Sequence, residues 1–200
     1  MIATSRSLSR HLPWLERALF ALAAGLLGWY VLQQLSTMYE QAVSSRELES
    51  IRISTTSMPR ITRTLPTGSL VGRIEIPRLG VSAIVREGDD ISTLRRSVGH
   101  IPDTVLPGES GNSGFAGHRD TFFRGLRNAR SGDRITVTTT DATLNYVIRN
   151  TRVVEPDDVS VLNPTPGHTL TLVTCYPFSY IGAAPQRFIV RAEMTADRGQ

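Results

Sequence analysis

Short hydrophobic and β-branched runs recur from Ser69 onward, and Gly, Pro, Asn and Asp separate them. Runs of this length bounded by turn residues are typical of β-strands. Two stretches, DDISTLRRS and DTFFRGLRNA, carry short helix signals, and an Asp that can cap a helix opens the first. The pattern predicts strands over residues 70–76, 81–86, 113–118, 134–140, 144–154, 169–175 and 187–194.

The spacing of these runs indicates the fold class. Seven or eight short strands follow one another between residues 69 and 195 without long helices between them. Such an arrangement is typical of all-β domains that close their sheet to remove its edges. We therefore predict an all-β, closed or nearly closed antiparallel barrel with short helices.

The pattern before this domain is different. From Ala18 to Tyr39 no residue is charged, and the stretch ALFALAAGLLGWYVL is almost wholly apolar. A helix of roughly 20 apolar residues crosses a bilayer, and the arginine excess upstream favours a cytoplasmic N-terminus. We predict a cytoplasmic segment (1–17) and one transmembrane signal anchor (18–39) in the cell membrane, with the rest extracytoplasmic. A cleaved signal peptide and a buried core helix are the alternatives.

Residues 40–68 predict a stalk between the anchor and the barrel. A modest helical stretch, YEQAVSSRELESI, gives way to STTSMPRITRTLPTG, which is rich in Ser, Thr and Pro. Such composition is typical of linkers. The predicted catalytic domain then spans residues 69–195, and residues 196–200 form a tail.

Composition and charge narrow the function. Hydrophobic content of 40% and charged content of 20% are globular values. The net charge is +4, but the 22 basic residues are all arginines scattered along the chain, which argues against nucleic acid as a partner. A single cysteine excludes an intramolecular disulfide and a zinc cluster. The acidic residues of EPDDVSVLNPTPG lack EF-hand spacing, so we predict no metal and no cofactor.

The one cysteine, Cys175, ends an apolar strand and precedes Tyr-Pro, at the rim of the predicted barrel. Most lone cysteines are buried and inert. If strands 169–175 and 187–194 pair antiparallel, however, Cys175 lies opposite Arg187 on the same face. A guanidinium there favours a thiolate and can hold an oxyanion.

A thiol nucleophile also needs a proton acceptor, and four histidines are available. His11 precedes the predicted anchor, and His100 lies in a turn before a proline. His168 opens the cysteine strand, about 23 Å from Cys175 along an extended chain. His118 ends an apolar strand and has the rim position of a catalytic group. Spacing alone does not bring it to Cys175, so an inert barrel remains an alternative.

Three segments resemble the signature segments of the sortases, which are membrane-anchored cysteine transpeptidases: GNSGFAGHRDTFFRGL, TLTLVTCYPF and APQRFIV. The resemblance covers residues 69–195, and CYPFSYIGAAPQRFIV is most similar to class D and the related Gram-negative sortases. It implies a sortase-type β-barrel with His118, Cys175 and Arg187 as catalytic residues. It also implies that Thr174 helps to shape the oxyanion region.

Two further residues of the motif are interpreted differently. Arg119 is interpreted as structural. Asp120 is interpreted as a helix cap and not as a residue that orients the histidine.

The resemblance also implies the reaction. Sortases cleave an LPxTG-like C-terminal sorting signal between Thr and Gly through a thioacyl-enzyme. They then transfer the acyl group to an amine of a wall precursor, a pilin lysine or another acceptor. The segment EPDDVSVLNPTPG matches the region that shapes the peptide groove. Two competing hypotheses are an L,D-transpeptidase, although no histidine lies within six residues of Cys175, and a membrane-tethered binding barrel without activity.

Overall fold

The computed structural model describes residues 16–32, 65–180 and 182–195, and the chain divides into two units, Met1–Glu40 and Gln41–Gln200. The predicted cytoplasmic segment up to residue 15, the last part of the predicted anchor, most of the stalk and the tail lie outside these ranges.

Residues 16–32 form a helix. Within the described ranges, no helix combines the length and the apolar character needed to cross a membrane. The large apolar side chains of this helix are exposed: Leu19, Phe20, Leu22, Leu26, Leu27, Trp29, Tyr30, Val31 and Leu32.

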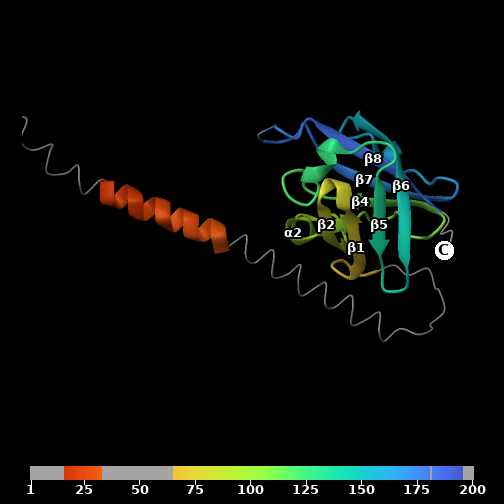
Figure 1. Cartoon of the computed structure of the whole chain (residues 1–200), viewed down its shortest axis with the longest axis horizontal. Helices are drawn as coiled ribbons and strands as arrows, with labels where there is room; N and C mark the ends of the chain where they lie inside the picture. The colour runs from red at the N-terminus through yellow and green to blue at the C-terminus, as the bar shows by residue number, and fades with distance from the viewer. Residues whose placement is uncertain (1–15, 33–64, 181, 196–200) are drawn as a thin grey trace, which may run out of the picture. The chain divides into compact units, whose positions relative to one another are not determined.

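The second unit contains eight strands that close into a barrel, as Figure 1 shows, and the all-β prediction is confirmed. The order around the barrel is β1-β2-β3-β4-β7-β8-β6-β5. Short helices lie in the connections between the strands. The strands are β1 (Leu70–Ile76), β2 (Val81–Glu87), β3 (Val98–His100), β4 (Gly111–Ala116), β5 (Arg134–Thr138), β6 (Thr143–Val154), β7 (His168–Tyr176) and β8 (Gln186–Met194). The helices are η1 (Pro77–Leu79), α2 (Ile91–Arg96), η2 (Arg124–Asn128) and η3 (Val159–Leu162).

The prediction of an antiparallel barrel is wrong at two places. β2 pairs with β3 in parallel, and β4 pairs with β7 in parallel. The alternation of side chains has the same period in both kinds of pair, so it does not distinguish them. β3 was not predicted at all, because three residues are too few to show an alternating pattern.

The two helix signals have different outcomes. The Asp90 side chain accepts hydrogen bonds from the backbone N–H groups of Ser92 and Thr93, which confirms the predicted cap of α2. Hydrogen bonds from the hydroxyl and N–H groups of the same two residues hold the pKa of Asp90 well below its usual range. The stretch DTFFRGLRNA forms only the 3₁₀ turn η2. Its Gly125 packs so closely that an added Cβ would lie 2.2 Å from the Leu79 carbonyl oxygen.

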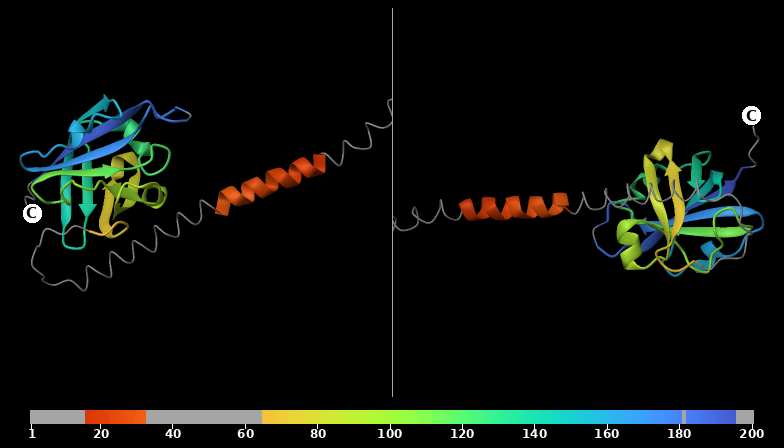
Figure 2. Two further views of the ribbon diagram at one scale, coloured as in Figure 1. Left: turned by 180° about the vertical axis from the view of Figure 1, so that it is seen from behind. Right: turned by 90° about the horizontal axis from the view of Figure 1, so that it is seen from below.

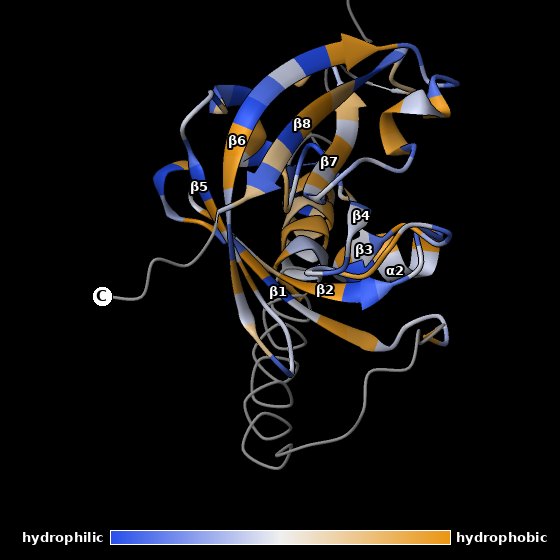
Figure 3. Cartoon of the chain, turned by 90° about the vertical axis from the view of Figure 1, so that its right-hand side faces the viewer, coloured by the Kyte–Doolittle hydropathy of each residue, from blue (hydrophilic) through white to orange (hydrophobic). Residues whose placement is uncertain are grey.

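The core lies inside the barrel, because alternate residues of each strand point inward. Figure 3 shows hydrophobic and hydrophilic residues alternating along the strands. Fully buried side chains come from strands all around the barrel, and each contributes about 1.5–3 kcal/mol. They include Ile74, Val85, Phe115, Val137, Ile148, Leu172 and Val190.

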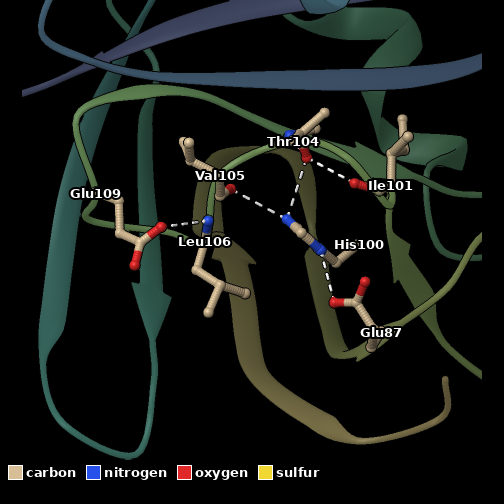
Figure 4. A network of polar contacts seen from close by, with 8 residues as sticks. Glu87, His100, Ile101, Thr104, Val105, Leu106 and Glu109 are labelled. Atoms are coloured by element: carbon tan, nitrogen blue, oxygen red, sulfur yellow. Dashed lines mark hydrogen bonds and ion pairs between the residues drawn. The ribbon is translucent and has the colours of Figure 1, made fainter. Parts of the chain in front are cut away.

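A buried histidine joins β2 to β3 and to the loop that follows (Figure 4). His100 Nδ1 lies 2.7 Å from Glu87 Oε2, and His100 Nε2 lies 3.1 Å from the Val105 carbonyl oxygen. Thr104 Oγ1, also 3.1 Å from Nε2, donates its hydrogen to the Ile101 carbonyl. Both ring nitrogens therefore lie within hydrogen-bonding distance of oxygen atoms. His100 is thus part of the fold and is not a free proton acceptor.

Replacing Glu87 with Ala is expected to lower the free energy of unfolding by about 3 kcal/mol, because the buried ring loses its charged partner. Chemical denaturation of the full chain, followed by far-UV circular dichroism, measures this loss. Glu75→Ala on β1 is the matched control, since its carboxylate pairs with no side chain of the described residues and its expected loss is below about 1 kcal/mol. Equal losses from the two variants would show that the Glu87–His100 pair adds nothing to stability.

Candidate active site

Cys175 lies near the end of β7, between β4 and β8. In the antiparallel β7–β8 pair, Cys175 is directly opposite Arg187. Directly opposed residues project their side chains on the same face of a sheet. The predicted pairing of these two strands is therefore confirmed. The thiol is free, and both residues are half-buried.

β4 brings His118 to the other side of Cys175. In the parallel β4–β7 pair, Ala116 lies opposite Val173. The Gly117 N–H donates to the Val173 carbonyl at 3.1 Å, and Thr174 Oγ1 donates to the Gly117 carbonyl at 2.7 Å. The residues that follow are His118 after β4 and Cys175 on β7, so the register makes these two residues neighbours. The parallel pairing of β4 and β7 thus supplies the proximity that sequence spacing could not predict.

The three side chains differ in their surroundings. The His118 side chain is exposed, and in the described part of the chain neither its ring nor the Cys175 thiol has a hydrogen-bond partner. Arg187 Nη1 donates to the carbonyls of Ala184 at 3.2 Å and Gln186 at 3.0 Å. A guanidinium has five N–H donors, so others remain for a ligand. No carboxylate of residues 65–180 or 182–195 pairs with it.

A thiol flanked by an imidazole and a guanidinium at the rim of a barrel has the parts needed for acyl transfer. The thiol is a nucleophile, the imidazole moves protons, and the guanidinium donates hydrogen bonds to an oxyanion. The exposure of His118 and the half-exposure of Cys175 leave them accessible to a substrate.

Comparison with protein families decides the identity. Residues 74–195 match the model of the sortase domain. The chain belongs to the sortase family. Sortases are transpeptidases. Membership in this family argues against the two alternatives considered from the sequence, an L,D-transpeptidase and a binding barrel without activity.

The resemblance to class D sortases is also confirmed. The chain is 33% identical to Sortase D of Bacillus subtilis (strain 168) over 186 residues, which cover 86% of this chain and 94% of that protein. A solved sortase D5 transpeptidase of Clostridium perfringens superposes with a TM-score of 0.65 at 28% identity, over 80% of this chain and 98% of that one. A Clostridium perfringens sortase C, solved with its C-terminal cell wall sorting motif, gives 0.62 at 25% identity, over 76% and 85%.

Thr174 of this sortase is buried, and its hydroxyl is used in the bond to the Gly117 carbonyl. That bond joins the strand of the cysteine to the segment that carries His118. Thr174 therefore positions the two candidate groups relative to each other. Its part in shaping the oxyanion region stays a prediction.

Arg119 has a role that the sequence indicated only in outline. Its side chain is 7% exposed and donates to three carbonyls of the β7–β8 connection: Pro177 at 2.9 Å, Tyr180 at 2.6 Å and Gly182 at 3.1 Å. The structural interpretation agrees with these contacts. The connection, blue in Figure 2, lies just beyond Cys175 and is thereby tied to the residue next to His118.

The interpretation of Asp120 as a helix cap is wrong. Its side chain is 72% exposed and lies 3.6 Å from Arg119 Nε. The next helix, η2, begins only at Arg124, and Phe123 occupies its N-cap position without a side-chain hydrogen bond. His168 is excluded as a proton acceptor, since it opens β7 at the end far from Cys175 and its Nδ1 lies 2.9 Å from the Glu109 carbonyl.

Replacing Arg119 with Met keeps the length of the side chain but removes all three bonds to the β7–β8 connection. We expect amide hydrogen exchange between Pro177 and Tyr180 to increase roughly tenfold or more, since each bond from a charged donor contributes about 1.5–3 kcal/mol. Arg134→Met, at the exposed start of β5, is the matched control. Unchanged exchange in the Arg119 variant would show that this arginine does not order the connection.

Proposed function

We propose that this sortase cleaves an LPxTG-like sorting signal between Thr and Gly and transfers the acyl group to an amine. The observation that supports the proposal is the register of β7, in which Cys175 lies opposite Arg187 and Val173 lies opposite Ala116, two residues before His118. The sortase C of Clostridium perfringens solved with a C-terminal sorting motif supports this class of substrate.

The first half-reaction forms a thioester. The Cys175 sulfur, whose proton His118 has taken, attacks the carbonyl carbon of the peptide Thr as a thiolate, and the bond from that carbon to the Gly nitrogen breaks. His118 passes the same proton to the departing amine. Arg187 donates hydrogen bonds to the oxyanion that develops on the carbonyl oxygen.

The second half-reaction forms the new amide. The nitrogen of the acceptor amine attacks the thioester carbon, the bond from carbon to sulfur breaks, and His118 takes the proton of the amine. This leaves Cys175 as a thiolate and the proton on His118, the state in which the next turnover begins. A thioester retains enough free energy to make an amide, so the cycle consumes no nucleotide and no redox partner.

The connection between β6 and β7, residues 155–167, is proposed as one wall of the peptide groove. The Asn112 side-chain amide donates to the carbonyls of Val161 at 3.0 Å and Asn163 at 3.2 Å, which holds η3 against β4. Val159 on η3 is 70% exposed and offers an apolar contact to a peptide side chain.

Product analysis tests the proposed reaction. The full chain is incubated with an LPxTG-type peptide and an amine, and mass spectrometry identifies the products. We expect a cut between Thr and Gly and an amide between Thr and the amine. A peptide with the same residues in scrambled order, and a muropeptide as the substrate of an L,D-transpeptidase, are the controls. A muropeptide product without peptide cleavage would contradict the proposal.

We also propose that residues 18–39 anchor the enzyme in the cell membrane, with a cytoplasmic N-terminus and an extracytoplasmic barrel. The absence of charge from Ala18 to Tyr39 and the exposed apolar side chains of the helix support this. Because Cys175 is the only cysteine, a membrane-impermeant maleimide reports its side of the membrane. We expect labelling in intact spheroplasts and none with Cys175→Ala. Labelling only after lysis would contradict the topology.

A further inference from the structure

A hollow of about 610 Å³ lies beside the proposed catalytic groups. Asp120, Arg124 and Arg127 line it from one segment, and residues 176–179 line it from another. The proposed reaction uses none of these side chains. We call this site the arginine hollow.

The charges of the arginine hollow favour an anion. Arg124 and Arg127 are exposed, and the Arg127 Nε donates to the Arg124 carbonyl at 3.1 Å, which holds it along η2. Neither guanidinium pairs with a carboxylate of the described residues. The one carboxylate of the lining, Asp120, faces Arg119 Nε at 3.6 Å. Two guanidinium groups without acidic partners therefore face one hollow.

The opposite wall is aromatic and firmly packed. The Tyr176 and Phe188 rings stack with centroids 6.2 Å apart, and Phe178 meets Phe188 edge-on at 5.3 Å. Arg119 holds the Pro177 carbonyl of the same segment. The wall is thus built to keep its shape when a ligand binds.

The position of the arginine hollow indicates which substrate it serves. One lining segment begins two residues after His118, and the other begins directly after Cys175. An attacking amine must contact both the thioester on Cys175 and the ring of His118. These segments border both groups, so they offer the rest of an acceptor molecule a path toward Arg124 and Arg127.

We propose that the arginine hollow binds an anionic group of the acyl acceptor and so selects amines that carry a carboxylate or a phosphate. Guanidinium groups pair with both anions through parallel N–H donors. This inference rests on the proposed function and assigns the class of its second substrate.

Acceptor competition tests the inference. The full chain receives a sorting peptide with an amidated C-terminus and one of two matched acceptor pairs. The first pair is diglycine and diglycine amide, and the second is phosphoethanolamine and ethanolamine. We expect kcat/KM for an anionic acceptor to exceed that of its neutral partner roughly tenfold, the effect of two partly solvated guanidinium contacts. The first pair reports a carboxylate and the second a phosphate.

The double variant R124Q/R127Q is expected to bring this ratio close to one. The double variant R95Q/R134Q, at exposed positions of α2 and β5, keeps the wild-type ratio and controls for the loss of two positive charges. Hydroxylamine, a small acceptor without an anion, is expected to release the acyl group equally fast from all variants.

Two results would overturn the inference while hydroxylamine release continues. One is equal use of both members of each pair by the wild-type chain, and the other is an unchanged ratio in R124Q/R127Q. Absence of hydroxylamine release from the wild-type chain would instead overturn the proposed function, and the inference with it.

Discussion

Replacing Cys175 with Ala is expected to abolish acyl transfer and to leave the barrel folded. We expect cleavage of the sorting peptide to fall by at least roughly 10⁴-fold, because no other group in the reaction can form the acyl intermediate. The side chain is half-buried at the end of β7, so its loss leaves no large cavity in the core. Peptide cleavage measured by mass spectrometry, together with far-UV circular dichroism, separates loss of chemistry from loss of fold.

Val173→Ala, two residues earlier on the same strand, is the matched control for the cysteine variant. It shortens a half-buried side chain of β7 without touching the thiol, so activity is expected to stay within about threefold of the wild type. Residual transfer by Cys175→Ala above the rate of the uncatalysed reaction would refute the assignment of the nucleophile.

Replacing His118 with Gln is expected to lower kcat/KM for peptide cleavage by about 10²–10⁴-fold, the range for loss of a general acid and base. The departing amine must then leave without a proton from the enzyme. The His118 side chain is exposed and without a hydrogen-bond partner among the described residues, so we expect little change in stability.

His168→Gln is the control for the histidine variant. Its ring contacts the Glu109 carbonyl at 2.9 Å and lies at the opposite end of β7 from Cys175. Activity is expected to change less than about threefold, since surface substitutions have small effects. If His168→Gln were as impaired as His118→Gln, or if His118→Gln remained fully active, the assignment of the proton carrier would be wrong.

The strands that carry the site could be predicted from sequence because their side chains alternate between the barrel interior and its outside. β1, β2, β7 and β8 lie within one residue of their predicted ends. β3 escaped prediction because it has only three residues, one of which, Gly99, is a weak strand former.

The distance between His118 and Cys175 could not be predicted from spacing. The register brings the two residues near each other only because β4 and β7 are adjacent parallel strands, and alternation says nothing about which strands become neighbours. The position of Arg187 was easier to predict, because β7 and β8 are consecutive along the chain and consecutive strands commonly pair.

The contacts of Arg119 show what a motif leaves out. The sequence placed an arginine next to His118, but its three acceptors are backbone carbonyls in a connection more than fifty residues away. Carbonyl groups are present in every residue, so no residue pattern marks them. The neighbouring Asp120 was misassigned because DTFFRGLRNA predicted a longer helix, whereas the observed turn η2 begins only at Arg124.

Mass spectrometry of the trapped enzyme tests most directly whether the reaction passes through a thioacyl intermediate on Cys175. The full chain is mixed with a sorting peptide, quenched in acid within seconds and digested to locate the added mass. We expect the residues of the peptide up to Thr on the fragment that contains Cys175, and we expect hydroxylamine to remove them. An unmodified cysteine during ongoing cleavage, or an acyl group on any other residue, would contradict this account.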